Sequence, residues 1–174
     1  ILKKLGIKVL TIGDYLEKSP LGKMEYMKLF GHLTGKSNLA DSLFTVKCSE
    51  YEELKDKLAE SIKESAPTPV LINMPYNGAW FIPGEQSYIS QLVRDAGGVV
   101  LGAKAGEHQS AQYGFEYIYS LGLQAKVWLH PNAINTLDEL GRENPMFVNI
   151  APFKTGEVYN NNLRSTPELG SDFW

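Results

Sequence analysis

The chain has 174 residues, of which 43% are apolar and 21% are charged, and its formal net charge is −3. This composition excludes a disordered or fibrous protein, and the missing basic field argues against nucleic acid as a partner. The single cysteine, Cys48, excludes a disulfide framework and a cysteine-based zinc site.

Both ends of the chain indicate a piece of a longer protein. Residues 7–12 have the apolar pattern of a buried strand, and the aromatic residues Phe173 and Trp174 close the sequence. A natural domain rarely begins in a core strand and ends on bare aromatic residues. We therefore expect a fragment, and the lack of a targeting signal says nothing about the compartment of the parent protein.

Two helices are predicted in the first third of the chain. Ser19 and Pro20 form a typical helix start, and Gly35 is a typical stop. An apolar stripe at helical spacing then predicts a long helix over most of residues 38–64. The stiff segment 66–69, with two prolines, is the best candidate for a domain boundary.

Beyond this segment, strand and helix patterns alternate. The expected strands cover residues 70–74, 99–101, 125–129 and 146–150, and the expected helices cover 87–96, 115–121 and 134–140. This order predicts an α/β fold, a three-layer unit with a mainly parallel central sheet.

Ligands of such sheets bind at the carboxyl ends of the strands. The loops expected there are 75–86, 103–113, 130–135 and 151–155. The first of them and its flank hold four aromatic residues that we expect to form a rigid wall for a bulky ligand: Tyr76, Trp80, Phe81 and Tyr88. The alternative, that these rings cover the sheet as part of the core, stays open.

The remaining chemical signals are weak. His108 and His130 fall on neighbouring loops, but without a third ligand a hydrogen-bonded role is favoured over a metal site. Gly97 and Gly98 follow a helix and precede a strand, the reverse of a phosphate-binding loop. We expect no catalytic residues and no resident metal.

Short motifs along nearly the whole chain resemble those of one protein family. They are YLEKSPLGKMEY (15–26), LTGK (33–36), AD (40–41), WFIPGEQSY (80–88), DAGG (95–98), GFE (114–116), AKVW (125–128) and GEVYNN (156–161). Their order and spacing are similar to those of the periplasmic metal-chelate binding proteins of ABC importers, which carry siderophores, haem and cobalamin.

The resemblance implies half of a two-lobe class III periplasmic-binding-protein fold. Members of this family have two α/β lobes joined by a long rigid helix, with the ligand between the lobes. Residues 1–19 would be the end of the first lobe, 20–66 the inter-lobe helical region, and 67–174 the second lobe, incomplete at its end.

The resemblance also implies roles for single residues. Trp80 and Phe81 would present aromatic contact to the ligand, and the helix that begins at Ser87 would favour an anionic chelate. Glu116 would dock onto the importer's membrane subunits. Arg164 would neutralise a carboxylate or catecholate of the ligand. The other ligand-binding candidates are Tyr76, Tyr88 and His108.

The function implied is capture rather than chemistry. The protein would bind an iron-siderophore, haem or cobalamin-type chelate outside the cytoplasmic membrane as a monomer without an intrinsic cofactor, and would deliver it to the permease. The identity of the chelate and lipid anchoring stay open. Two alternatives stay open as well, an α/β domain of a cofactor-dependent oxidoreductase with nitrogenase-like layer order and a non-catalytic interaction domain.

Overall fold

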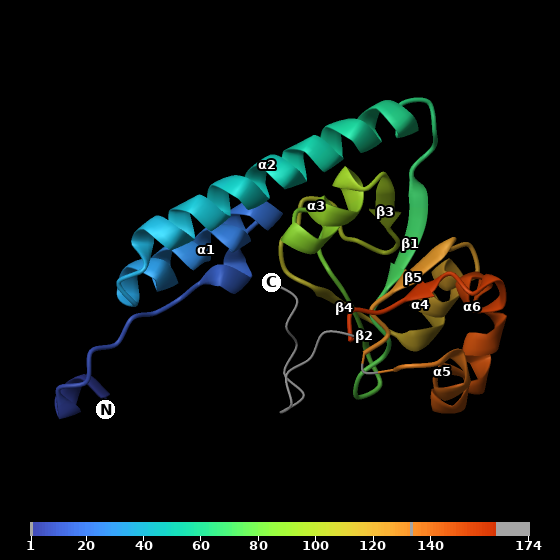
Figure 1. Cartoon of the computed structure of the whole chain (residues 1–174). Helices are drawn as coiled ribbons and strands as arrows, with labels where there is room; N and C mark the ends of the chain where they lie inside the picture. The colour runs from blue at the N-terminus through green and yellow to red at the C-terminus, as the bar shows by residue number, and fades with distance from the viewer. Residues whose placement is uncertain (1, 133, 163–174) are drawn as a thin grey trace.

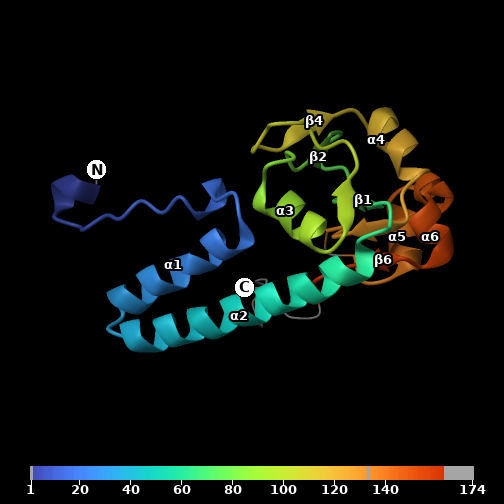
Figure 2. The same cartoon turned by 90° about the horizontal axis from the view of Figure 1, so that it is seen from above.

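The computed structural model describes residues 2–132 and 134–162, and it consists of a helical hairpin followed by an α/β unit (Figure 1). The hairpin is formed by α1 (Pro20–Leu33) and α2 (Ser37–Ile62), which lie side by side. Figure 2 shows α2 extending well past α1 toward the first strand of the sheet. Two short 3₁₀ helices precede the hairpin, η1 (Leu2–Leu5) and η2 (Asp14–Leu16).

The start of α1 confirms the predicted cap. The Ser19 hydroxyl accepts a hydrogen bond from the Gly22 amide at 3.0 Å, and Pro20 occupies the first turn. Such a cap satisfies one of the amides that a helix start leaves without an intrahelical partner. The 26 residues of α2 agree with the predicted long helix and give it a length of about 39 Å.

The α/β unit contains a parallel sheet with the strand order β3-β1-β5-β6. Its strands are β1 (Thr68–Ile72), β3 (Gly98–Val100), β5 (Val127–Leu129) and β6 (Val158–Tyr159). The helices of the unit are α3 (Tyr88–Asp95), α4 (Phe115–Gly122), α5 (Leu137–Glu143) and α6 (Ala151–Thr155). The predicted fold class, a mainly parallel sheet layered with helices and preceded by a long helix, is confirmed.

A small second sheet was not predicted. Strands β2 (Trp80–Ile82) and β4 (Ala111–Tyr113) pair antiparallel, with Trp80 opposite Tyr113. A tight turn leads into β2, with Asn77 and Gly78 both at positive φ, the arrangement that an Asn-Gly hairpin turn requires. The predicted loop 75–86 therefore contains a tight turn closed by the Tyr76–Ala79 bridge, followed by strand β2.

Two predicted strands are absent from the described structure. Residues 7–12 pair with no described strand, so their backbone lacks the hydrogen-bonding neighbour that a strand requires. Residues 146–150 instead fall largely in the 3₁₀ helix η3 (Pro145–Asn149), since Pro145 starts the turn and the Asn144 side chain accepts from the Met146 amide at 2.9 Å. The loop expected at 151–155 is α6, and the fourth strand end lies instead at the end of β6.

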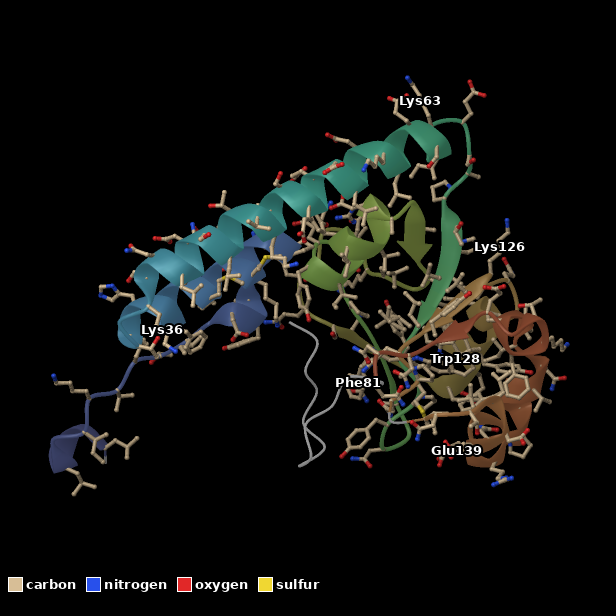
Figure 3. All side chains as sticks on the ribbon, in the orientation of Figure 1. Lys36, Lys63, Phe81, Lys126, Trp128 and Glu139 are labelled. Carbon is tan, nitrogen blue, oxygen red and sulfur yellow. The ribbon has the colours of Figure 1, made fainter. Side chains whose placement is uncertain are left out.

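The hydrophobic core of the α/β unit is rich in aromatic residues. Trp80 and Trp128 are completely buried, and Phe147 is 1% exposed. Their ring centroids lie 5.2 to 6.1 Å apart, the range of favourable aromatic pairs. Figure 3 shows Trp128 inside the α/β unit, and labels Lys36 and Lys63 at the two ends of α2.

Candidate functional site

A large pocket is lined by residues at the carboxyl ends of β1, β5 and β6 and by the segment before α1. That segment approaches the α/β unit beside α3 (Figures 1 and 2). Its volume is about 1230 Å³. The residues that line it come from four places: Tyr15–Lys18 before α1, Ser87–Ile89 with Leu92 and Val93 of α3, Glu107–Ser110, and the strand ends Ile72, Asn73, Leu129, His130 and Tyr159–Asn161, together with Pro83. The predicted position at the carboxyl end of the sheet is thus where the pocket lies.

Asn73, the residue directly after β1, is fixed on all sides. Its amide donates to the Leu129 carbonyl at 3.0 Å, and its own carbonyl accepts from the Trp128 indole at 2.6 Å. Its side-chain Nδ2 donates to the Phe81 carbonyl at 2.8 Å. Because a carbonyl only accepts, this bond determines which end of the amide is nitrogen, and Oδ1 is left to face His130.

His130, directly after β5, is held by that oxygen. Its Nδ1 lies 3.2 Å from Asn73 Oδ1, and its backbone amide donates to the Tyr159 carbonyl at 2.8 Å. Burial lowers the pKa of His130 below its ordinary value, so the ring is neutral near pH 7. The backbone has φ +56°, a left-handed conformation that non-glycine residues seldom adopt.

His108 belongs to a loop that packs closely against residues 84–86. The Gln86 amide donates to the Glu107 carbonyl at 2.8 Å, and the Glu85 carboxylate accepts from the Gly106 amide at 2.8 Å. A Cβ on Gly84 would overlap the Glu107 carbonyl, so this approach requires glycine. His108 Nδ1 lies 3.1 Å from the Gln86 carbonyl and must be the donor.

Ser87 and Tyr88 both line the pocket at the start of α3. The Ser87 hydroxyl caps the helix, accepting from the Ser90 amide at 3.2 Å. The ring of Tyr88 lies 4.5 Å from Lys23 Nζ, and Lys23 also pairs with Asp14 at 3.6 Å. These contacts join the segment before α1 to α3 across one side of the pocket.

The predicted ligand contact of Trp80 is wrong. Its side chain is completely buried, its ring stacks on Phe115, and its indole donates to the Ile72 carbonyl at 2.9 Å. The alternation of β2 explains this, because Trp80 and Ile82 face the core while Phe81 faces outward. Trp80 and Trp128 thus each donate an indole hydrogen bond to a backbone carbonyl at the end of β1.

Tyr76 and Phe81 are exposed, by 64% and 39% respectively, but neither lines the pocket. Glu116 is exposed in the first turn of α4, away from the pocket lining. Arg164 lies outside the described residues. Of the predicted ligand-binding residues, the structure therefore brings together Ser87, Tyr88 and His108.

Sequence reasoning missed the polar residues of the strand ends. Asn160 donates from its side chain to the carbonyls of Asn132 and Ile134, at 2.6 and 2.8 Å. Asn73 immediately follows the apolar strand β1, and a polar residue at the carboxyl end of a parallel strand could have indicated a site residue. Among the described residues, no group of three or more His, Cys, Asp or Glu side chains is arranged to hold a bare metal ion.

Comparisons with known proteins agree with this architecture. The family model described as "Periplasmic binding protein" matches residues 4–162. An uncharacterized lipoprotein of Methanocaldococcus jannaschii is 26% identical over 161 residues, which cover 90% of this chain and 37% of that protein.

Solved structures share the fold at low sequence identity. A periplasmic haem-binding protein of Pseudomonas aeruginosa has a TM-score of 0.64 at 16% identity, covering 86% of this chain and 53% of its own. A siderophore-binding protein of Vibrio cholerae bound to Fe³⁺-Desferal has a TM-score of 0.62 at 16% identity, covering 91% and 60%.

The chain spans 37% of the curated relative and little more than half of these two structures. The family model nevertheless covers most of its length. The chain belongs to the periplasmic binding protein family.

Proposed function

We propose that this chain is part of the substrate-binding component of an ABC importer, and that it captures a metal chelate of the siderophore, haem or cobalamin class. Family membership supports the binding role, and the ligands of the Pseudomonas and Vibrio proteins named above support the chelate class. The protein acts by binding and release, without a chemical step of its own.

The observation that carries the proposal is the pocket at the carboxyl ends of the strands. Its volume of about 1230 Å³ exceeds the roughly 300–1,000 Å³ of common small-molecule sites, as a bulky chelate demands. Apolar surface from Tyr88, Ile89 and Leu92 lies beside the polar strand ends. Such a lining covers the organic body of a chelate while a few polar groups orient it.

We further propose that α1 and α2 form the inter-lobe region and that residues 67–174 belong to the second lobe. The pocket is then one side of the cleft, with residues 15–18 entering it from the first lobe. The α1–α2 hairpin supports this division, because it leaves apolar side chains such as Phe30 and Leu43 about half exposed.

Delivery to the importer is assigned to Glu116. Its exposed carboxylate lies at a helix start away from the pocket, so docking and ligand capture do not compete for the same surface. We place the protein outside the cytoplasmic membrane, with lipid anchoring consistent with the lipoprotein named above. Within the described residues, no helix is both long and apolar enough to span a bilayer.

A side-by-side titration tests the proposal. The purified protein is mixed with a ferric trihydroxamate, haemin and cobalamin, and intrinsic tryptophan fluorescence is followed, because Trp128 bonds to Asn73 beneath the pocket. We expect saturable quenching by one of the three, with Tyr88→Ala weakening it and Tyr76→Ala leaving it unchanged. Lack of saturable binding to every chelate would contradict the proposal.

A further inference from the structure

One edge of the pocket is an irregular loop whose position depends on its neighbours. Residues 107–110 of this loop all line the pocket. The loop is bonded to the segment that precedes α3, because the Gln86 amide donates to the Glu107 carbonyl at 2.8 Å and the Gly106 amide donates to the Glu85 carboxylate at 2.8 Å. A displacement of the segment before α3 would therefore displace this edge of the pocket.

Arg94 of α3 holds that segment from the other side. Its Nη1 donates to the Glu85 carbonyl at 2.8 Å, and its Nη2 donates to Gln91 Oε1 at 2.8 Å. A guanidinium is planar and its donors point in fixed directions, so two simultaneous bonds fix its orientation. Glu85 is thus bonded to Arg94 through its backbone and to the loop through its side chain, and neither Arg94 nor Glu85 lines the pocket.

Two further hydrogen bonds connect Arg94 to α2, which lies beside α3 (Figure 1). Gln91 Nε2 donates to one carboxylate oxygen of Asp95 at 2.7 Å, and the Tyr51 hydroxyl donates to the other at 2.6 Å. A guanidinium only donates and an ionised carboxylate only accepts, so the Gln91 amide between them has a single orientation. A polar network that is satisfied in this way favours one arrangement of its members.

The pocket and this network use different residues of α3. The pocket-lining residues of the helix are Tyr88, Ile89, Leu92 and Val93. The residues of the network are Gln91, Arg94 and Asp95. A substitution at Arg94 therefore leaves the pocket-lining side chains of α3 unaltered, and its effect on a bound ligand has to pass through Glu85 and the loop.

We infer that Arg94 is a positioning residue for ligand binding: through Glu85 it keeps loop 107–110 at the edge of the pocket, without contact to the ligand. This inference rests on the proposed function and extends it to residues outside the pocket. Groups that contact a ligand have to be held in place by the residues around them, because a loosely supported group binds less well.

The test measures chelate affinity in matched variants. The probes are a ferric trihydroxamate, haemin and cobalamin, followed by tryptophan fluorescence. Arg94→Met keeps an apolar stem but removes both donors. Arg142→Met is the matched control, because Arg142 is also an exposed arginine in the last turn of a helix and lies outside the pocket. Glu85→Ala removes the acceptor for the loop, whereas Glu85→Gln keeps an acceptor oxygen.

Amide hydrogen exchange of the ligand-free protein, measured by NMR, provides a second reading. The amides of Gln86 and Gly106 report on the junction between the loop and the segment before α3. The amide of Trp128, which donates to the Glu157 carbonyl within the sheet, reports on the stability of the α/β unit as a whole. A local loss of positioning accelerates exchange at the first two amides and leaves the third unchanged.

We expect Arg94→Met and Glu85→Ala each to weaken the binding of the chelate that saturates the wild-type protein by about fivefold, the factor that corresponds to one net hydrogen bond. Both variants should accelerate exchange at Gln86 and Gly106. Glu85→Gln should restore affinity and exchange nearly to the wild-type values, and Arg142→Met should change neither.

Three results would overturn the inference: unchanged exchange at Gln86 and Gly106 in Arg94→Met, wild-type affinity in that variant, or an equal acceleration at Trp128. An equal loss of affinity in Arg142→Met would overturn it as well. Failure of the wild-type protein to bind any of the three chelates would overturn the proposed function together with the role of Arg94 in binding. The exchange measurement requires no ligand, so a failure of loop positioning is distinguishable from a failure of the proposed function.

Discussion

The α/β unit buries many of its apolar side chains, whereas the helical hairpin leaves most of its large ones exposed. Among the described residues, every hydrophobic side chain counted as buried belongs to the α/β unit except Ala40. The hairpin instead exposes large residues on both helices, including Leu33 at 59% and Leu54 at 59%. The α/β unit is thus stabilised by its own buried core, whereas the hairpin buries little apolar surface beyond the contact of α1 with α2.

The largest expected effect is at Trp80. Replacing it with alanine removes a completely buried ring that touches three other aromatic residues. We expect a loss of about 3–5 kcal/mol in the free energy of unfolding. Urea unfolding followed by circular dichroism measures it, with Phe81→Ala as the neighbouring exposed control. A loss below that of the control would contradict the core position.

The contact between the two regions gives a second prediction. The Tyr51 hydroxyl of α2 donates to the Asp95 carboxylate of α3 at 2.6 Å, and Gln91 donates to the other carboxylate oxygen at 2.7 Å. Burial, followed by the bond to Asp95, raises the pKa of Tyr51 well above its usual value. Tyr51→Phe should cost about 1.5 kcal/mol at pH 8.

The pH dependence follows from the same bond. The folded state keeps the Tyr51 proton more tightly than the unfolded state, so the stabilisation is complete below the unfolded pKa of about 10 and declines at higher pH. Unfolding measured at pH 8 and pH 11 should bring wild type and Tyr51→Phe closer together. A difference that grows with pH would contradict the assigned bond.

His130 gives a smaller effect of the opposite sign. Its pKa is lowered by burial, so the unfolded chain binds a proton that the folded chain lacks. The folded state therefore loses stability as the pH falls below the unfolded value of about 6.5. Proton NMR of the ring measures the pKa directly, and an unshifted or raised value would contradict the half-buried site. His130→Asn should remove its part of the acid destabilisation.

The smallest effect is expected on the exposed face of α2. Leu43 and Leu54 are 47% and 59% exposed. Their replacement by serine should change the stability of this chain by about 0.5 kcal/mol or less. Thermal unfolding measures it, and a loss comparable to that of Trp80→Ala would show that the hairpin has a core of its own.

The sequence predicted the order of elements well because the order depends on local signals. Ser19, Ser87 and the spacing of α2 act within a few residues, and all three appear as predicted. The prediction of a strand at 146–150 is wrong, because the Asn144 cap and Pro145 begin a helical turn that the apolar content of this segment does not reveal. Buried apolar runs do not separate strand from helix by pattern alone.

The site was less predictable because it depends on pairings between distant residues. The pairing of β2 with β4 decides which face of the strand Trp80 occupies. Because β2 is only three residues long, its sequence is too short to show an apolar alternation that would reveal this face. Asn73 and His130 are 57 positions apart and meet because β1 and β5 are neighbours. The sequence shows that both side chains are polar, but it does not predict that they contact each other.

Hydrogen exchange with and without chelate tests the central claim most directly. The account predicts that binding slows exchange at residues 83–89, 107–110 and 129–132, which surround the pocket. The turn and strand β2 that carry Tyr76 and Phe81 should exchange as before. Protection confined to residues 76–81, or no change at the strand ends despite saturating chelate, would contradict the claim that the pocket is the binding site.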